Sequence, residues 1–95
     1  MGRGELNFTM DKITQEEIKH IIAVQENCDI AISKGIREIW FVGDNSTELR
    51  ILFLGHYRLT ISRVNFERKR CGTMTKILFV LIDFCKKNNI QKIIV

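Results

Sequence analysis

The stretch that decides the fold is Leu59–Asn89, with the sequence LTISRVNFERKRCGTMTKILFVLIDFCKKNN. It reads as a strand, a basic turn with one glycine and a long apolar segment. In that last segment Lys76, Asp83 and Lys87 share one helical stripe, which favours a helix over Thr73–Asn88 rather than a buried strand. The opposite, apolar stripe of this helix consists of Met74, Ile77, Leu78, Leu81 and Cys85.

The turn before this helix has the composition of a phosphate site. The first N–H groups of a helix have no partner within the helix, and the helix dipole favours negative charge there. Gly72 lets a phosphate approach the backbone, and Arg68–Arg70 add positive charge. We therefore predict that Lys69–Thr75 holds the phosphates of a nucleotide-like cofactor. A strand–glycine–helix junction is also common in ordinary loops, so the turn alone does not decide the function.

The N-terminal third predicts a short strand followed by one or two helices. Leu6, Phe8 and Met10 alternate with polar residues over Leu6–Met10, as in a half-buried strand. Thr14–Glu17 has the form of a capping box, which predicts a helix start at Thr14. We expect Asn27–Asp29 to divide two short helices. The second helix would continue the apolar stripe at Ile30 or Ala31 and would stop at Gly35, with Ile36 folding back onto it.

The middle of the chain predicts three strands, over Ile39–Val42, Leu49–Leu54 and Tyr57–Phe66. Their short connections favour an antiparallel meander, and Trp40 is expected in the core. A last strand at Ile93–Val95 follows the helix, and such a crossover makes it parallel to the third meander strand. The predicted fold is therefore a single α+β domain over residues 1–95, with helices packed on a mixed, mostly antiparallel sheet.

Cysteine usage and hydropathy exclude several classes of protein. Cys28, Cys71 and Cys85 are far apart and form no CxxC pair, which argues against a structural zinc site or a disulfide framework and favours a reduced, cytoplasmic protein. The longest apolar run, Ile77–Ile82, is too short to cross a bilayer, and we expect no membrane association. The formal net charge of +4 indicates an anionic partner, either a phosphorylated cofactor or a nucleic acid.

The segment Val64–Met74, followed by Ile77-Leu78, resembles the acetyl-CoA-binding segment of GNAT-type N-acetyltransferases. That family has a strand ending in Val, a turn of the form Arg/Gln-x-x-Gly-x-Gly/Ala and a helix with a Leu pair. Lys69 falls at the Arg/Gln position, Gly72 at the first Gly and Met74 at the Gly/Ala position. More weakly, the chain is similar to short acetyltransferase-like proteins of phages and mobile elements.

The resemblance implies a GNAT-like fold that lacks the usual C-terminal helix and strands of the family after Val95. The co-substrate would be acetyl-CoA, with its pyrophosphate on the N–H groups of Arg70–Met74. Its pantetheine arm would lie along the backbone of Ser62 and Val64, in the splay beside Ile93–Val95. The implied cofactor-binding residues are Ser62, Val64, Lys69, Arg70, Cys71, Gly72, Thr73, Met74 and Thr75.

The implied reaction is acetyl transfer to a primary amine of a protein or a small molecule. No catalytic residue is assigned, although Asp44 and Glu48 are the acidic residues closest to the meander loops and are candidates for the base. One alternative is a non-catalytic interaction module of the same fold, which would form a homodimer by strand pairing at an exposed sheet edge. The other is a small basic nucleic-acid-binding protein, which is less expected because the sequence shows no helix-turn-helix and no aromatic platform.

Overall fold

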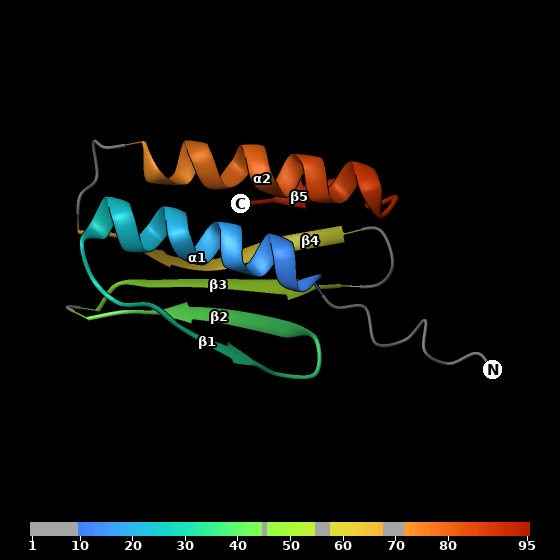
Figure 1. Cartoon of the computed structure of the whole chain (residues 1–95). Coiled ribbons are helices and arrows are strands. Elements are labelled where there is room, and N and C mark those ends of the chain that lie inside the picture. The colour runs from blue at the N-terminus through green and yellow to red at the C-terminus, as the bar shows by residue number, and fades with distance from the viewer. Residues whose placement is uncertain (1–9, 45, 55–57, 68–71) are drawn as a thin grey trace.

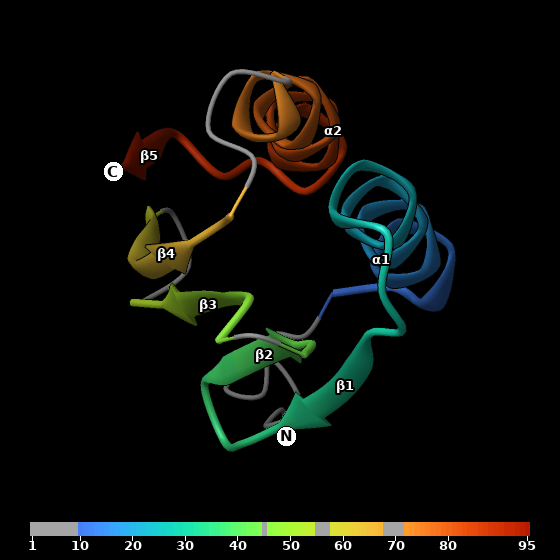
Figure 2. The ribbon, with the colours of Figure 1, turned by 90° about the vertical axis from the view of Figure 1, so that its left-hand side faces the viewer.

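The computed structural model describes residues 10–44, 46–54, 58–67 and 72–95. Two helices lie on one face of a five-stranded sheet, and the sheet curls around them (Figures 1 and 2). The helices are α1 (Lys12–Glu26) and α2 (Thr73–Lys87), and the strands are β1 (Ala31–Lys34), β2 (Glu38–Val42), β3 (Glu48–Phe53), β4 (Arg58–Asn65) and β5 (Lys92–Ile94).

The order of strands in the sheet follows the order in the sequence, β1-β2-β3-β4-β5. Neighbours from β1 to β4 are antiparallel, and β5 runs parallel to β4 after the α2 crossover. This confirms the α+β class, the antiparallel meander and the parallel last strand. No helix in the described part of the chain is both long and apolar enough to pass through a membrane.

The core lies between the concave face of the sheet and the two helices. Burial alternates strictly along β3, as expected for a strand with one face on the core. On α2 the predicted apolar stripe is confirmed, because Ile77 and Leu81 are fully buried while Asp83 and Lys87 are exposed and form an i,i+4 ion pair of 3.1 Å. The largest fully buried side chains are Phe41, Ile18, Ile22, Leu49, Ile51, Leu59, Ile77 and Leu81.

The prediction for residues 30–36 was wrong, because the structure has a strand where we expected a second helix. Helix α1 ends at Glu26, and its C-cap residue Asn27 adopts the left-handed conformation (φ 55°). The chain then forms β1, where the β-branched Ile32 lies opposite Phe41 of β2. Gly35 belongs to the β1–β2 hairpin and donates its N–H to Glu38 C=O at 3.0 Å. Ile36 is 82% exposed, so it does not fold back onto a helix.

The start of α1 also differs from the prediction. The N-cap is Asp11, whose carboxylate accepts hydrogen bonds from the N–H (3.1 Å) and the hydroxyl (2.6 Å) of Thr14. Thr14 therefore lies inside the helix as the partner of the cap. The predicted strand Leu6–Met10 falls, apart from Met10, outside the described residues; Met10 is buried in the core but is not part of a strand.

Trp40 lies on the convex face of the sheet, away from both helices, so its expected place in the core was wrong. Its neighbours Ile39 and Phe41 take the two core positions on β2, and side chains alternate between the faces of a strand. The indole instead packs against Arg50 on β3, with the guanidinium carbon 5.0 Å from the ring centroid.

β4 contains a β-bulge at Ser62. The register passes from Ile51 opposite Ile61 to Arg50 opposite Arg63, which leaves Ser62 as an extra residue on β4. A bulge of this kind bends the strand and reverses which side chains face the core. Beyond it, Val64 rather than Arg63 points to the helix side of the sheet, opposite Leu49.

Candidate functional site

A cleft of about 330 Å³ opens between the end of β4 and the beginning of α2. The C-terminal end of β4, the first turn of α2 and the C-terminal end of α1 lie at the same end of the molecule, at the left in Figure 1. The cleft is lined by Val64, Asn65, Phe66, Gly72, Thr73, Met74 and Thr75.

The floor of the cleft is apolar and open to solvent. Val64 is 40% exposed although it points to the helix side of the sheet, whereas Phe66, two residues on, is buried. The bulge at Ser62 is the reason, because without the extra residue the alternation would place Arg63 and Asn65 on this side. The change in side-chain alternation after the bulge thus gives the cleft a small apolar floor.

The wall formed by α2 presents backbone N–H groups that have no acceptor within the helix. Its first intrahelical hydrogen bond runs from Lys76 N–H to Gly72 C=O at 3.0 Å, so the N–H groups of Thr73, Met74 and Thr75 have no acceptor within the helix. Gly72 at the N-cap has no side chain to accept from them, and the first turn carries no acidic residue. The positive end of the helix dipole therefore faces the cleft without a carboxylate on its own first turn.

Gly72 adopts a conformation that side chains disfavour. Its φ is 72°, in the left-handed region, and a Cβ built on it would meet no described residue within 4 Å. Glycine is thus required here by backbone conformation and not by crowding. The space where a side chain would stand remains available to a ligand.

Thr73, the first residue of α2, carries a buried polar group beside the cleft. The residue is 3% exposed, and its hydroxyl oxygen is shielded from water without a hydrogen-bond partner among the described residues. A buried hydroxyl without a partner costs about 1–3 kcal/mol. Because Thr73 lines the cleft, a ligand oxygen bound at the helix start is a suitable partner.

The strand side of the cleft offers backbone groups as well. Leu54 N–H donates to Arg58 C=O, so the even-numbered residues of β3 direct their backbone N–H and C=O groups toward β4. Glu48 and Asn65 therefore direct these groups toward each other. Val64 therefore directs its N–H and C=O to the other side of β4. On that side β5 pairs only with Arg58–Thr60, and no other described strand covers the end of β4.

A buried carboxylate holds the segment that leaves β4. Glu26, the last residue of α1, is 8% exposed and accepts a hydrogen bond from Glu67 N–H at 2.6 Å. This bond spans 41 residues of sequence and joins the end of α1 to the chain directly after the cleft residue Phe66. Sequence analysis did not single out Glu26, because its only signal is a long-range contact.

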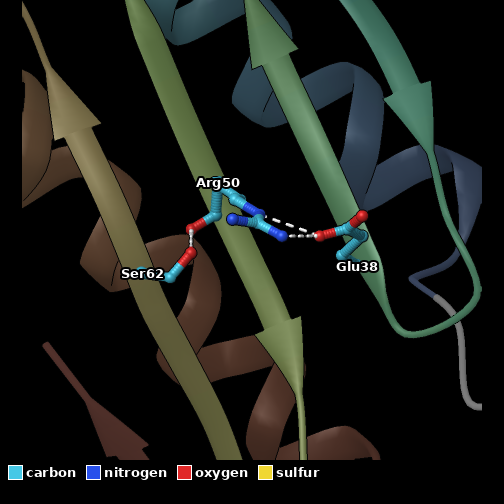
Figure 3. A network of polar contacts seen from close by, with 3 residues as sticks. All are labelled: Glu38, Arg50 and Ser62. Atoms are coloured by element: carbon cyan, nitrogen blue, oxygen red, sulfur yellow. Dashed lines mark hydrogen bonds and ion pairs between the residues drawn. The ribbon is translucent and has the colours of Figure 1, made fainter.

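Five of the residues expected at the cofactor site line this one cleft: Val64, Gly72, Thr73, Met74 and Thr75. The structure adds Asn65 and Phe66, which sequence analysis did not select. Ser62 is not among the lining residues; it forms the bulge and its hydroxyl lies 3.4 Å from Arg50 C=O (Figure 3). Lys69, Arg70 and Cys71 lie outside the described residues.

The two acidic residues considered as bases are not at the cleft. Glu48 forms an ion pair of 3.1 Å with Arg63, on the convex face of the sheet. Asp44 is in the β2–β3 turn, where its C=O accepts from Thr47 N–H. Neither residue lines the cleft, so the described residues give no support to either as the base.

No group of three or more potential ligand side chains gathers within the described ranges to form a metal site. Comparison with known proteins gives no significant match, whether to a family model, to a curated protein or to a solved structure.

Proposed function

We propose that the chain is a GNAT-type N-acetyltransferase that binds acetyl-CoA in the cleft between β4 and α2. The proposal rests on one observation, the position of the start of α2 opposite the end of β4. A helix start whose first N–H groups have no acceptor within the helix lies across a 330 Å³ cleft from the end of β4, and no described strand pairs with that end on its β5 side.

The helix start suits the pyrophosphate. The N–H groups of Thr73, Met74 and Thr75 would donate to the phosphate oxygens, and the Thr73 hydroxyl would donate a further hydrogen bond. Anion binding of this kind also offsets the cost of the buried hydroxyl. In the sequence the basic residues Arg68–Arg70 precede this helix, separated from it by Cys71 and Gly72.

The strand end suits the amide-containing arm of the cofactor. An extended chain with amide groups can pair with an open strand edge as an additional strand does. The Val64 N–H and C=O point to that side, and the apolar Val64 side chain contributes to the floor of the cleft. The thioester would then lie along β4, where an acceptor amine would attack it, with the Val64 N–H as a donor to the developing oxyanion. A cytoplasmic location belongs to the same proposal.

The test is a calorimetric titration with acetyl-CoA of three proteins: the parent chain, Gly72→Ala and Gly72→Trp. The two variants impose the same left-handed strain, but only tryptophan fills the cleft, because a Cβ at Gly72 meets no described residue within 4 Å. We expect saturable binding by the parent and by Gly72→Ala, and loss of binding in Gly72→Trp. Equal binding by all three proteins, or none by the parent at millimolar cofactor, would contradict the proposal.

A second assay separates the enzyme from the non-catalytic alternative. Release of free CoA thiol is followed while primary amines of peptides and small molecules are supplied to the cofactor-loaded protein. Amine-dependent thiol release supports acetyl transfer. Tight binding without thiol release for any amine would leave the cofactor site in place and identify the chain as a non-catalytic module.

A further inference from the structure

The convex face of the sheet carries a second set of functional groups, separate from the cleft. No helix covers this face in the described part of the chain (Figure 2). Side chains that alternate away from the core gather there on β2, β3, β4 and β5. The residues used below, which we call the outer face, are Trp40, Arg50, Leu52, Arg58, Thr60 and Lys92.

Trp40 and Arg50 form a fixed layered pair at one end of the outer face. The Arg50 guanidinium carbon lies 5.0 Å from the centroid of the Trp40 ring. Glu38 holds this guanidinium by accepting hydrogen bonds from Nε (2.8 Å) and Nη2 (Figure 3). The Arg50 side chain retains 34% exposure, so its plane is both oriented and accessible. Nucleic-acid bases stack on aromatic rings and on guanidinium planes of this kind.

Arg58 and Lys92 form an unbalanced positive pair at the other end. They lie opposite each other on β4 and β5, and both are exposed. Like charges that face each other across strands are destabilising, and no acidic side chain forms an ion pair with either one among the described residues. Arg50 and Arg63, by contrast, are each paired with a glutamate. An anionic partner would relieve the repulsion between Arg58 and Lys92.

Between these two ends lies a short strip formed by Leu52 and Thr60. Leu52 is next to Thr60 across β3 and β4. The Thr60 hydroxyl and the Trp40 indole N–H have no hydrogen-bond partner among the described residues. The strip separates Arg58 from Arg50 by four residues of β3, or about 13 Å at the usual rise of a strand. That span suits a few nucleotides of an extended strand.

We propose that the outer face binds single-stranded nucleic acid, with the phosphates at Arg58 and Lys92 and a base stacked on the Arg50–Trp40 pair. The observations favour this partner over an acidic peptide. A peptide is held in a groove or by pairing with a sheet edge, whereas these side chains project from the convex face of β2, β3, β4 and β5. Stacking on an aromatic–guanidinium pair adds an interaction that carboxylates do not make. This surface does not depend on the proposed acetyl-CoA cleft.

The only tryptophan of the chain serves as the reporter. The full chain is titrated with a ten-residue oligothymidylate, and binding is followed by tryptophan emission and by anisotropy of a fluorescein label on the oligonucleotide. We expect saturable quenching of Trp40 with the same affinity as the anisotropy change. Saturating acetyl-CoA should not displace the oligonucleotide. Binding without quenching, displacement by acetyl-CoA, or no binding at low salt would each overturn the proposal.

Two double variants of equal charge locate the site. Arg58→Gln with Lys92→Gln alters the outer face, while Lys12→Gln with Lys86→Gln removes two exposed cations from the helices. The outer-face variant should bind roughly tenfold more weakly, and its slope of log affinity against log salt should be shallower by about 1.4, from about 0.7 per phosphate contact on a single strand. The helix variant should bind as the parent does. Equal weakening of both variants, or equally tight binding of polyglutamate by the parent, would refute the proposal.

Discussion

Leu49 and Val64 lie opposite each other on β3 and β4 and point to the same side of the sheet, yet Leu49 is fully buried and Val64 is 40% exposed. The difference arises because the cleft lies over Val64 while the core covers Leu49. Two cross-strand neighbours thus mark the boundary between the core and the candidate site.

This boundary gives a matched pair of substitutions. Leu49→Ala should lower the free energy of unfolding by about 2–5 kcal/mol, as other large-to-small changes in cores do. Val64→Ala should cost less than about 1 kcal/mol, because its side chain is already partly in water, and it should weaken acetyl-CoA binding. Urea denaturation and calorimetry measure the two effects. A large loss of stability in Val64→Ala would show that Val64 belongs to the core and not to the cleft floor.

Substitution by alanine should destabilise the fold at both Gly72 and Gly43, for different physical reasons. Gly72→Ala places a side chain at φ 72° in open space and should cost about 1 kcal/mol, which for a domain of this size lowers Tm by about 4–8 °C. Gly72→Asn should cost less, since asparagine tolerates the left-handed region. Gly43→Ala has no such strain, but its Cβ would meet Ile30 Cδ1 at 2.7 Å and Cys28 Sγ at 2.9 Å.

Overpacking of that kind typically costs about 1–3 kcal/mol, and asparagine at Gly43 should be worse than alanine. Asparagine should thus be less destabilising than alanine at Gly72 but more destabilising than alanine at Gly43. Thermal unfolding of the four variants measures both differences. If asparagine were worse than alanine at Gly72, a steric cause would replace the conformational one.

Thr73→Val should separate stability from binding. Valine has nearly the same shape, and it removes a buried hydroxyl without a partner among the described residues, so the variant should be as stable as the parent or more stable. If the hydroxyl serves the cofactor, acetyl-CoA affinity should fall by about tenfold, the equivalent of about 1.4 kcal/mol. Thr73→Ser is the control, because it retains the hydroxyl. Unchanged affinity in Thr73→Val would remove Thr73 from the site.

Most of the fold followed from periodicity, and the exceptions have local causes. Strands β2, β3 and β4 were predicted from their β-forming residues and the turns between them, and helix α2 from its polar and apolar stripes. The prediction for β1 was wrong because its four residues, Ala31–Lys34, carry too little pattern to separate a strand from a helix, and the pairing of Ile32 with Phe41 decides. The expected burial of Trp40 was wrong because only alternate residues of β2 face the helices, and Ile39 and Phe41 occupy those positions.

The candidate site was predictable in part. The glycine and the hydroxyl residues at the start of α2 can be recognised in sequence, because a helix start needs few local features. The bulge at Ser62 has no such signature, since it depends on the register between β3 and β4. Glu26 likewise reaches the site only through the fold, by its bond to Glu67 N–H. Interactions that join distant segments are the part that the sequence alone does not provide.

Glu26 offers a test of how the segment after the cleft is held. Glu26→Ala removes the acceptor of Glu67 N–H and should cost about 1–3 kcal/mol, with weaker acetyl-CoA binding as the end of β4 loosens. Glu26→Gln keeps a carbonyl oxygen and should retain most of both properties. Urea denaturation and calorimetry on the two variants measure this. Glutamine as harmful as alanine would indicate that the charge, and not the acceptor, is needed.

Asp11 predicts a pH dependence of stability at the start of α1. The side-chain hydrogen bond from Thr14 lowers the pKa of Asp11 in the folded chain, so folding favours the ionised carboxylate. A group with a depressed folded pKa stabilises fully above its unfolded pKa, about 3.9, and loses that contribution as the pH falls through the folded value. Asp11→Ala should therefore be less stable than the parent at pH 7, by about 1 kcal/mol, as for other lost N-caps.

The difference in free energy of unfolding between the parent and Asp11→Ala should decrease as the pH falls from about 5 toward 3. The reason is that the parent then loses the ionised cap, which the variant lacks at every pH. Asp11→Asn separates charge from hydrogen bonding, since asparagine caps a helix well but does not titrate. Its stability relative to Asp11→Ala should remain nearly constant over the same range. Urea denaturation of the three proteins between pH 3 and pH 7 measures these differences. A gap between the parent and Asp11→Ala that does not change with pH would mean that the ionised carboxylate does not stabilise the helix start.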